Sequence, residues 1–329
     1  MKNKITVIGG SGFIGTNLCQ ALREKKIDFE IIDLKISKQF SKFCKIGDVR
    51  NIDSLNRQIS GDIVINLAAI HRDDVTRKAD YFDTNVTGAK NVVLACLNKK
   101  IKKIIFTSSV AVYGLPDKVI GEDGKINPFN EYGRTKFEAE EIFRKWQLQS
   151  NHSLIIVRPT VVFGEGNRGN VFNLFNQIAS GKFIMIGSGK NKKSIAYIGN
   201  IVSFLEYCIF SKEKNGLYNY VDTPDMTMSA LVNLVHCKLH KKSTKILRIP
   251  YFFGLMIGYF FDVISLITRK KFSISSIRIR KFVSSTEFLS SKENLNGFVA
   301  PFDLSEGIKR TIFSEFIKQE KNKEIFFSE

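Results

Sequence analysis

The stretch ITVIGGSGFIG, residues 5–15, decides the fold of this chain. Its first four residues form a short β-branched run, which predicts a buried strand. Gly9, Gly12 and Gly15 follow this strand and open a helical stretch, so they predict a tight turn whose backbone amides lie at a helix N-terminus. Such a turn binds a pyrophosphate, because both the amides and the helix dipole favour an anion. Strand, turn and helix together predict a dinucleotide site.

Further residues of this site follow from where the next strands end. Asp33 closes a second β-branched run 18 residues beyond Gly15, where a carboxylate accepts both ribose hydroxyls and repels a 2'-phosphate. Asp33 therefore favours NAD over NADP, although Lys35 nearby keeps NADP open. Asp48 and Val49 lie where an adenine is held. Ala68 and Ala69 follow the predicted strand at 63–67 and are small enough for a cofactor ring to pack closely against them. Ordinary packing of the strand is the alternative interpretation of these two residues. The other residues assigned to NAD are Phe13, Ile14, Leu67 and Pro159.

The order of the predicted elements favours a doubly wound α/β fold with a parallel sheet. Apolar runs alternate with helical stretches in the first 160 residues, which indicates strands buried on both faces. From about Gly164 the elements become shorter. We therefore divide the chain into an NAD-binding Rossmann domain, residues 1–163, and a smaller substrate-binding lobe, residues 164–329, with an interwoven boundary. The remaining predicted elements are strands at 29–32, 63–67, 104–106, 154–157 and 194–198, and helices at 171–180 and 200–210.

Charge and cysteine content limit the class of partner. The 329 residues carry 50 Lys and Arg against 32 Asp and Glu, a net charge of +18, which attracts phosphates, nucleic acid or an anionic membrane. No basic ribbon interleaved with aromatic residues is present, so we expect no nucleic-acid partner. The five cysteines are scattered, without a CxxC pair, which argues against disulfides and a metal site and favours a reducing cytosol. The start MKNKITVIGG enters a strand at once, so we expect no secretory leader.

Tyr132 and Lys136, in the run YGRTK, are the candidate reactive pair. On a helix the four-residue spacing puts the phenol and the ammonium on one face. A nearby ammonium favours the phenolate, so we expect a lowered tyrosine pKa and a Tyr132 able to take a proton from a hydroxyl. The same spacing is common on amphipathic helices. Because a nucleotide loop precedes it, we predict an enzyme, with a non-catalytic NAD-binding or scaffold protein as the alternative.

The motifs GGSGFIG, Asp33, TSSVAVYG (107–114) and YGRTK, in this order and spacing, resemble the extended short-chain dehydrogenase/reductase family of nucleotide-sugar epimerases and dehydratases. The resemblance covers almost the whole chain. It implies that Ser109, five residues before Gly114, is the catalytic serine, with Ser108 as the fallback. It also implies that Tyr132 is the general acid/base, that Lys136 lowers its pKa and holds the nicotinamide ribose, and that Asn85 supports the site from a facing helix.

Longer strings refine the resemblance. HRDDV (71–75), RPTVVFGEGNRGNVFNL (158–174), KSIAYIGNI (193–201), YNYVDTPD (218–225) and SSIRIRKF (275–282) resemble 4-epimerases of N-acetylglucosamine linked to undecaprenyl diphosphate. This implies an isomerase that forms the N-acetylgalactosamine product through a transient 4-keto sugar, for O-antigen, lipopolysaccharide or other surface polysaccharide synthesis. The strings are also similar to UDP-aminosugar 4-epimerases and to 4-ketoreductases of UDP-4-keto-6-deoxy-aminosugars, so these alternatives stay open. Lys193-Ser194 and Gly199-Asn200 depart from the UDP-galactose epimerases, which argues against a UDP-glucose substrate.

The resemblance also proposes substrate ligands. Arg168 and Asn170 lie in a glycine-rich loop and are candidates for the sugar and phosphate, and Ser108 follows a strand at the ligand edge of the sheet. Arg278 is a candidate for a diphosphate or a lipid headgroup together with Arg280 and Lys281, with solvated surface charge as the alternative. The full substrate-binding prediction is His71, Ser108, Arg168, Asn170, Lys193 and Arg278.

The stretch YFFGLMIGYFFDVISLI, residues 251–267, has Asp262 as its only charge and is followed by Arg269, Lys270 and Lys271. As a helix it spans about 25 Å, short of the roughly 30 Å hydrocarbon core, so it is a poor spanning helix. It is either a buried core helix or a helix in the membrane interface. A polyprenyl substrate favours the second, and predicts a peripheral or monotopic enzyme on anionic lipids at the cytoplasmic face of the inner membrane. Relatives in the family also suggest a homodimer.

Overall fold

A computed structural model of the chain describes residues 4–72, 75–116, 118–150, 152–240, 246–270, 272, 274–295, 297–318 and 324–327. Asp73 and Asp74 of the string HRDDV, and Lys271 of the basic run after the apolar stretch, lie outside the described residues.

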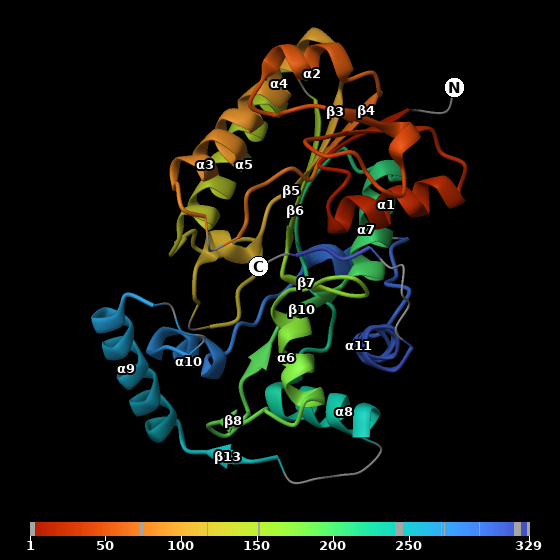
Figure 1. Cartoon of the computed structure of the whole chain (residues 1–329). Coiled ribbons are helices and arrows are strands. Elements are labelled where there is room, and N and C mark those ends of the chain that lie inside the picture. Colours follow the sequence, from red (N-terminus) through yellow and green to blue (C-terminus); the bar gives the residue numbers. More distant parts are fainter. Residues whose placement is uncertain are drawn as a thin grey trace.

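A seven-stranded parallel sheet forms the centre of the molecule, with strand order β11-β6-β5-β4-β1-β2-β3 (Figure 1). Its side chains point alternately into two apolar clusters, so Val7 belongs to one and Ile8 to the other. Because both faces of the sheet are buried, the sequences of its central strands are continuous apolar runs. The doubly wound α/β prediction is confirmed. The strands are β1 Ile5–Ile8, β2 Phe29–Asp33, β3 Cys44–Ile46, β4 Ile63–Asn66, β5 Lys103–Thr107, β6 Ser153–Pro159 and β11 Asn215–Tyr220.

Helices cover both faces of the sheet (Figure 1). One face carries α2 Ile52–Gln58, α4 Gly88–Asn98 and α5 Glu131–Ser150, and the other carries α1 Phe13–Glu24 and α7 Ile198–Phe210. Each predicted strand of the sheet is confirmed, with ends moved by up to two residues. β3 and β11 were missed, because β3 is short and largely exposed and β11 contains only one apolar side chain, Leu217, beyond its tyrosines.

Beyond the sheet lies a lobe of shorter elements, as expected from residue 164 onward (Figure 1). Its helices include α6 Asn170–Ala179, α8 Met228–His240 and α11 Leu304–Ile312, and β7 Val161–Phe163 pairs with β10 Ile195–Tyr197. The chain also returns from this part to the sheet, since β11 pairs with β6. The division at residue 163 remains a prediction.

The apolar stretch forms α9, Tyr251–Thr268, which pairs with α10, Ser276–Val283, at the margin of the molecule (Figure 1). Gly254 and Gly258 are the buried residues of α9, so 11% of the residues in this helix are buried. The core-helix alternative is therefore wrong. Among the described residues, α9 is the one helix that is long enough and apolar enough to cross a membrane.

Candidate active site

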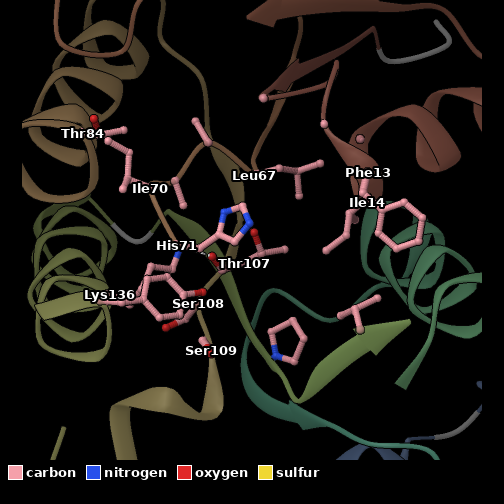
Figure 2. A pocket seen from close by; sticks show the side chains of 18 of the residues that line it. Phe13, Ile14, Leu67, Ile70, His71, Thr84, Thr107, Ser108, Ser109 and Lys136 are labelled. Carbon is pink, nitrogen blue, oxygen red and sulfur yellow. Dashed lines mark hydrogen bonds between the residues drawn. The ribbon is translucent and has the colours of Figure 1, made fainter. Parts of the chain in front are cut away.

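A cavity of about 750 Å³ opens at the carboxyl ends of β1, β2, β4, β5 and β6, where open α/β sheets bind ligands. Figure 2 shows its lining side chains from the glycine loop on one side to the serines and Lys136 on the other. The structure thus joins most of the predicted residues in one cleft. Those that line it are Gly9, Gly12, Phe13, Ile14, Gly15, Asp33, Asp48, Val49, Leu67, Ala68, Ala69, His71, Ser108, Ser109, Tyr132, Lys136, Pro159 and Asn170.

The glycine loop has the shape that a phosphate requires. Gly9 has φ +81°, and a Cβ there would lie 2.6 Å from the backbone nitrogen of Ala68. A side chain at this position would therefore force the loop away from β4. Gly12 precedes the first turn of α1 and offers no side-chain cap, so the amides of that turn are left to a ligand.

Asp33 lies beside this loop with a fixed carboxylate. Its Oδ2 accepts a hydrogen bond from the Ser11 backbone nitrogen at 3.0 Å, and its Oδ1 accepts one from the Lys35 nitrogen at 3.3 Å. These contacts hold the carboxylate at the edge of the cleft, where an adenosine ribose follows a pyrophosphate bound at the loop.

Asp48 is paired with Arg50, a cavity residue that sequence analysis missed. The guanidinium donates to both carboxylate oxygens of Asp48, at 2.9 and 2.7 Å. This bidentate contact lowers the pKa of Asp48. The spacing Asp-Val-Arg was the available signal, because a turn after a strand brings side chains two residues apart within reach of each other, and the Arg50 nitrogen also donates to Asp48 Oδ1 at 2.9 Å.

Ser109 and Tyr132 meet through a hydrogen bond between their side chains. Ser109 also caps the short helix η3, Val110–Tyr113, by accepting from the Ala111 nitrogen at 3.1 Å. The helix α5 that carries Tyr132 approaches η3 closely, because a Cβ at Gly133 would lie 2.3 Å from the Ala111 oxygen. Glycine at this position therefore lets the phenol reach the serine.

The tyrosine pKa differs from the expectation. Burial raises the pKa of Tyr132, and the Ser109 hydrogen bond opposes this rise. Lys136 does not offset the burial, because its ammonium donates to the Thr107 oxygen at 2.5 Å and lies 4.3 Å from the Phe106 ring centroid. The expected lowering of the Tyr132 pKa by Lys136 is therefore not observed.

Lys136 is itself strongly perturbed. Its side chain is buried, which lowers its pKa from 10.5 to about 7, while Glu140 opposes the fall. Between these two values the unfolded chain holds a proton that the folded chain does not. Lys136 therefore makes the free energy of unfolding rise with pH between these two pKa values.

We expect this rise to disappear in Lys136→Met. In cofactor-free protein, the wild-type unfolding free energy should increase from pH 7.5 to pH 9.5 more steeply than that of the variant, by up to about 1.4 kcal/mol per pH unit. Urea unfolding at three pH values measures both slopes. Parallel slopes would contradict the lowered lysine pKa.

Two further side chains meet at the wall beside Lys136, as Figure 2 shows for Ser108 and His71. Ser108 is buried, and its Oγ has no hydrogen-bond partner among the described residues. A buried unpaired hydroxyl is costly unless a ligand satisfies it. Burial lowers the pKa of His71, and Lys136 adds to this effect. A neutral histidine and a free hydroxyl suit a polar, uncharged ligand such as a sugar.

Four predicted residues lie outside the cavity lining. Asn85 acts behind it: its side chain bonds the backbone of Ile70 and the Thr135 hydroxyl at 3.0 Å, which ties β4 to the helix of Tyr132. Arg168 is ion-paired to Glu315 at 2.6 Å, so its assigned role at the sugar and phosphate is not supported. Lys193 donates to the Lys281 oxygen at 2.7 Å, and Arg278 is exposed on α10.

The cleft fits NAD on three independent features: a loop free to bind a pyrophosphate, a fixed Asp33 carboxylate, and an unpaired Ser108 hydroxyl at the opposite end. A model of the NAD dependent epimerase/dehydratase family matches residues 5–219. The chain belongs to this family, and NAD is its cofactor.

Within the family, one relative matches at full length. The chain is 46% identical over 339 aligned positions to the N-acetyl-alpha-D-glucosaminyl-diphospho-ditrans,octacis-undecaprenol 4-epimerase of Escherichia coli O157:H7, covering 100% of both. It is 26% identical to the UDP-glucose 4-epimerase of Vibrio cholerae, over 94% of this chain and 95% of that one.

Solved structures show the same fold. The UDP-glucose 4-epimerase of Thermotoga maritima superposes with a TM-score of 0.74 at 20% identity, covering 94% of this chain and 97% of that one. The UDP-N-acetylglucosamine 4-epimerase of Bacillus cereus gives 0.74 at 17% identity, covering 94% and 98%.

Proposed function

We propose that the chain is an NAD-dependent 4-epimerase that converts N-acetylglucosamine linked to undecaprenyl diphosphate into the N-acetylgalactosamine form, for surface polysaccharide synthesis. The observation that carries the proposal is the full-length identity of 46% to a relative named for that activity. The contact between Ser109 and Tyr132 supports it, because an epimerase needs one group to move a proton at the sugar oxygen.

In the proposed reaction the phenolate form of Tyr132, which the positive charge of a bound nicotinamide would favour, takes the proton of the sugar 4-hydroxyl and later returns it to the same oxygen. Ser109 bonds the tyrosine oxygen and orients it toward that hydroxyl. NAD held by the glycine loop and Asp33 would supply the hydride acceptor and donor for the sugar carbon, so that no net oxidation would result. Lys136 lines the cavity from the same helix as Tyr132, and we assign it to the nicotinamide ribose.

Ser108, His71 and Asn170 are the wall residues that we assign to the sugar. Because the substrate has a polyprenyl tail, we place the enzyme peripherally at the cytoplasmic face of the inner membrane, on anionic lipids. Homodimer formation remains a prediction.

The test compares two substrates without added cofactor. Protein in detergent is incubated with undecaprenyl-diphosphate N-acetylglucosamine or with UDP-N-acetylglucosamine, and the released sugars are separated. We expect the N-acetylgalactosamine product from the lipid-linked substrate. Conversion of the UDP sugar alone would contradict the proposal, and stoichiometric consumption of NADH with a 4-keto sugar would instead indicate a ketoreductase.

A further inference from the structure

The helix α9 has two opposite faces. Gly254, Gly258 and Asp262 recur every four residues and therefore lie along one face. That face packs on the protein: a Cβ at Gly254 would lie 2.6 Å from Ile186, and one at Gly258 would lie 2.8 Å from the Ser276 backbone. The Asp262 carboxylate accepts a hydrogen bond from the Ser276 nitrogen at 3.1 Å. The one charge of the helix is thus satisfied on the packed side.

The opposite face of α9 is apolar and exposed along its whole length. Phe252 is 67% exposed, Phe260 is 63% exposed and Leu266 is 82% exposed. Such a continuous apolar surface is unusual on a protein that is surrounded by water. Its other exposed members are Phe253, Met256, Tyr259, Val263 and Ile267.

The segments that flank this apolar face in the sequence are positively charged. Residues 246–284 contain seven Lys and Arg against the single Asp262. Arg269 and Lys270 follow the C-terminal end of α9, and Arg280 of α10 bonds the Tyr259 hydroxyl at the side of the face. An apolar strip beside cations is the pattern of a helix in the interface of an anionic membrane. A protein partner for this surface would need to be both apolar and acidic.

The packed face excludes a spanning orientation for this conformation. A helix that crosses the bilayer leaves the protein body at one of its ends, whereas α9 contacts the body through Gly254 near its start and through Asp262 in its second half. Both of its ends also return to the protein, at β13, Arg248–Ile249, and at α10.

We propose that α9 lies flat in one leaflet of an anionic membrane, with its Phe252–Leu266 face among the acyl chains and with Arg269, Lys270 and the cations of α10 at the headgroups. The exposed Phe and Leu side chains supply the binding energy by leaving water, and the cations add to it.

This placement also brings the active site to the membrane, a consequence that rests on the proposed function. Thr286 and Phe288 line the cavity and follow α10 after a few residues. Thr286 is fixed there, since its nitrogen donates to the Lys192 oxygen at 3.0 Å and its oxygen accepts from the Ser194 nitrogen at 2.9 Å. A sugar diphosphate can therefore reach the cavity along α10 while its polyprenyl tail stays in the leaflet.

The first test is flotation of the full chain with vesicles of phosphatidylcholine, with and without phosphatidylglycerol. We expect binding that is stronger with phosphatidylglycerol. Leu266→Glu should lower it about tenfold or more. Val299→Glu is the matched control, because Val299 is equally exposed at 84% but lies in a loop outside α9, and it should bind as the wild type does. Equal binding by both variants, or no binding by the wild type, would overturn the proposal.

A second test separates a flat helix from a spanning one. Nitroxide labels on Phe252→Cys, Val263→Cys and Ile267→Cys, with the exposed Cys237 replaced by serine, report depth in the bilayer. A flat helix gives similar depths, whereas a spanning helix separates the first and last labels by about 22 Å. The second result would overturn the proposal. So would a wild-type dimer that Leu266→Glu converts to monomer without any vesicle binding.

Neither test uses the substrate, so the membrane placement of α9 and the proposed function can be contradicted separately. Vesicle binding without conversion of the lipid-linked sugar would contradict the proposed function and support the membrane placement of α9. If both hold, Leu266→Glu should lose conversion of the lipid-linked sugar in vesicles and keep it in detergent, because the residue lies outside the cavity lining.

Discussion

Replacing Tyr132 by phenylalanine is expected to lower kcat by about 10³-fold, within the range of about 10² to 10⁴ for loss of a general acid/base. The phenol oxygen bonds Ser109 in the cleft and is the group placed to move the proton of the sugar hydroxyl. The ring remains, so α5 should keep its packing on η3. Initial rates of 4-epimerisation on the lipid-linked sugar measure the effect.

Two controls separate chemistry from folding. Tyr132→Phe should keep the cofactor content and the thermal midpoint of the wild type, because the change removes one hydroxyl. Tyr207→Phe makes the same change on α7, outside the cavity lining, and should leave kcat unchanged. Turnover of Tyr132→Phe at the wild-type rate would contradict the assignment of Tyr132 as the general acid/base.

The sequence predicted the part of the site that local patterns encode. Gly9, Gly12 and Gly15 follow a strand directly, and Asp33 ends the next one, so their meeting at one sheet edge follows from the parallel order of the strands. Tyr132 and Lys136 share a helix face by their spacing alone.

What the sequence could not predict depends on partners distant in the chain. Arg168 seemed free for a phosphate, but Glu315 comes from 147 residues further on and forms an ion pair with it. The pKa of Tyr132 follows from its burial and from the Thr107 oxygen that holds the Lys136 ammonium. These contacts cannot be predicted from the spacing of residues in the sequence.

The exposure of α9 is a similar case. A run of seventeen residues with Asp262 as its only charge is compatible with a core helix and with a membrane helix, because hydropathy does not show which other residues pack against the run. The structure removes the core-helix interpretation, because Ile186 and Ser276 pack on Gly254 and Gly258 and the opposite face of α9 is uncovered.

A buried ion pair behind the site sets the largest expected stability effect. Arg158 of β6 donates to the Glu140 carboxylate of α5 through two nitrogens, at 2.8 and 2.5 Å, and to the Tyr113 hydroxyl at 2.6 Å. The Arg158 and Glu140 side chains are 2% and 0% exposed. Removing one partner of such a pair leaves the other charge without compensation in a site that water does not reach.

We therefore expect Arg158→Met to lower the free energy of unfolding by about 3–5 kcal/mol, because the buried Glu140 carboxylate loses both of its hydrogen bonds from Arg158. Chemical denaturation of the cofactor-free protein measures the loss. Arg144→Met is the matched control: Arg144 lies 3.7 Å from the same Glu140 carboxylate but is 37% exposed, so its loss should cost less than about 1 kcal/mol. Adding Glu140→Leu to Arg158→Met should restore most of the stability, since the pair is then replaced by apolar side chains. A double variant as unstable as Arg158→Met would show that packing, and not the unpaired carboxylate, causes the loss.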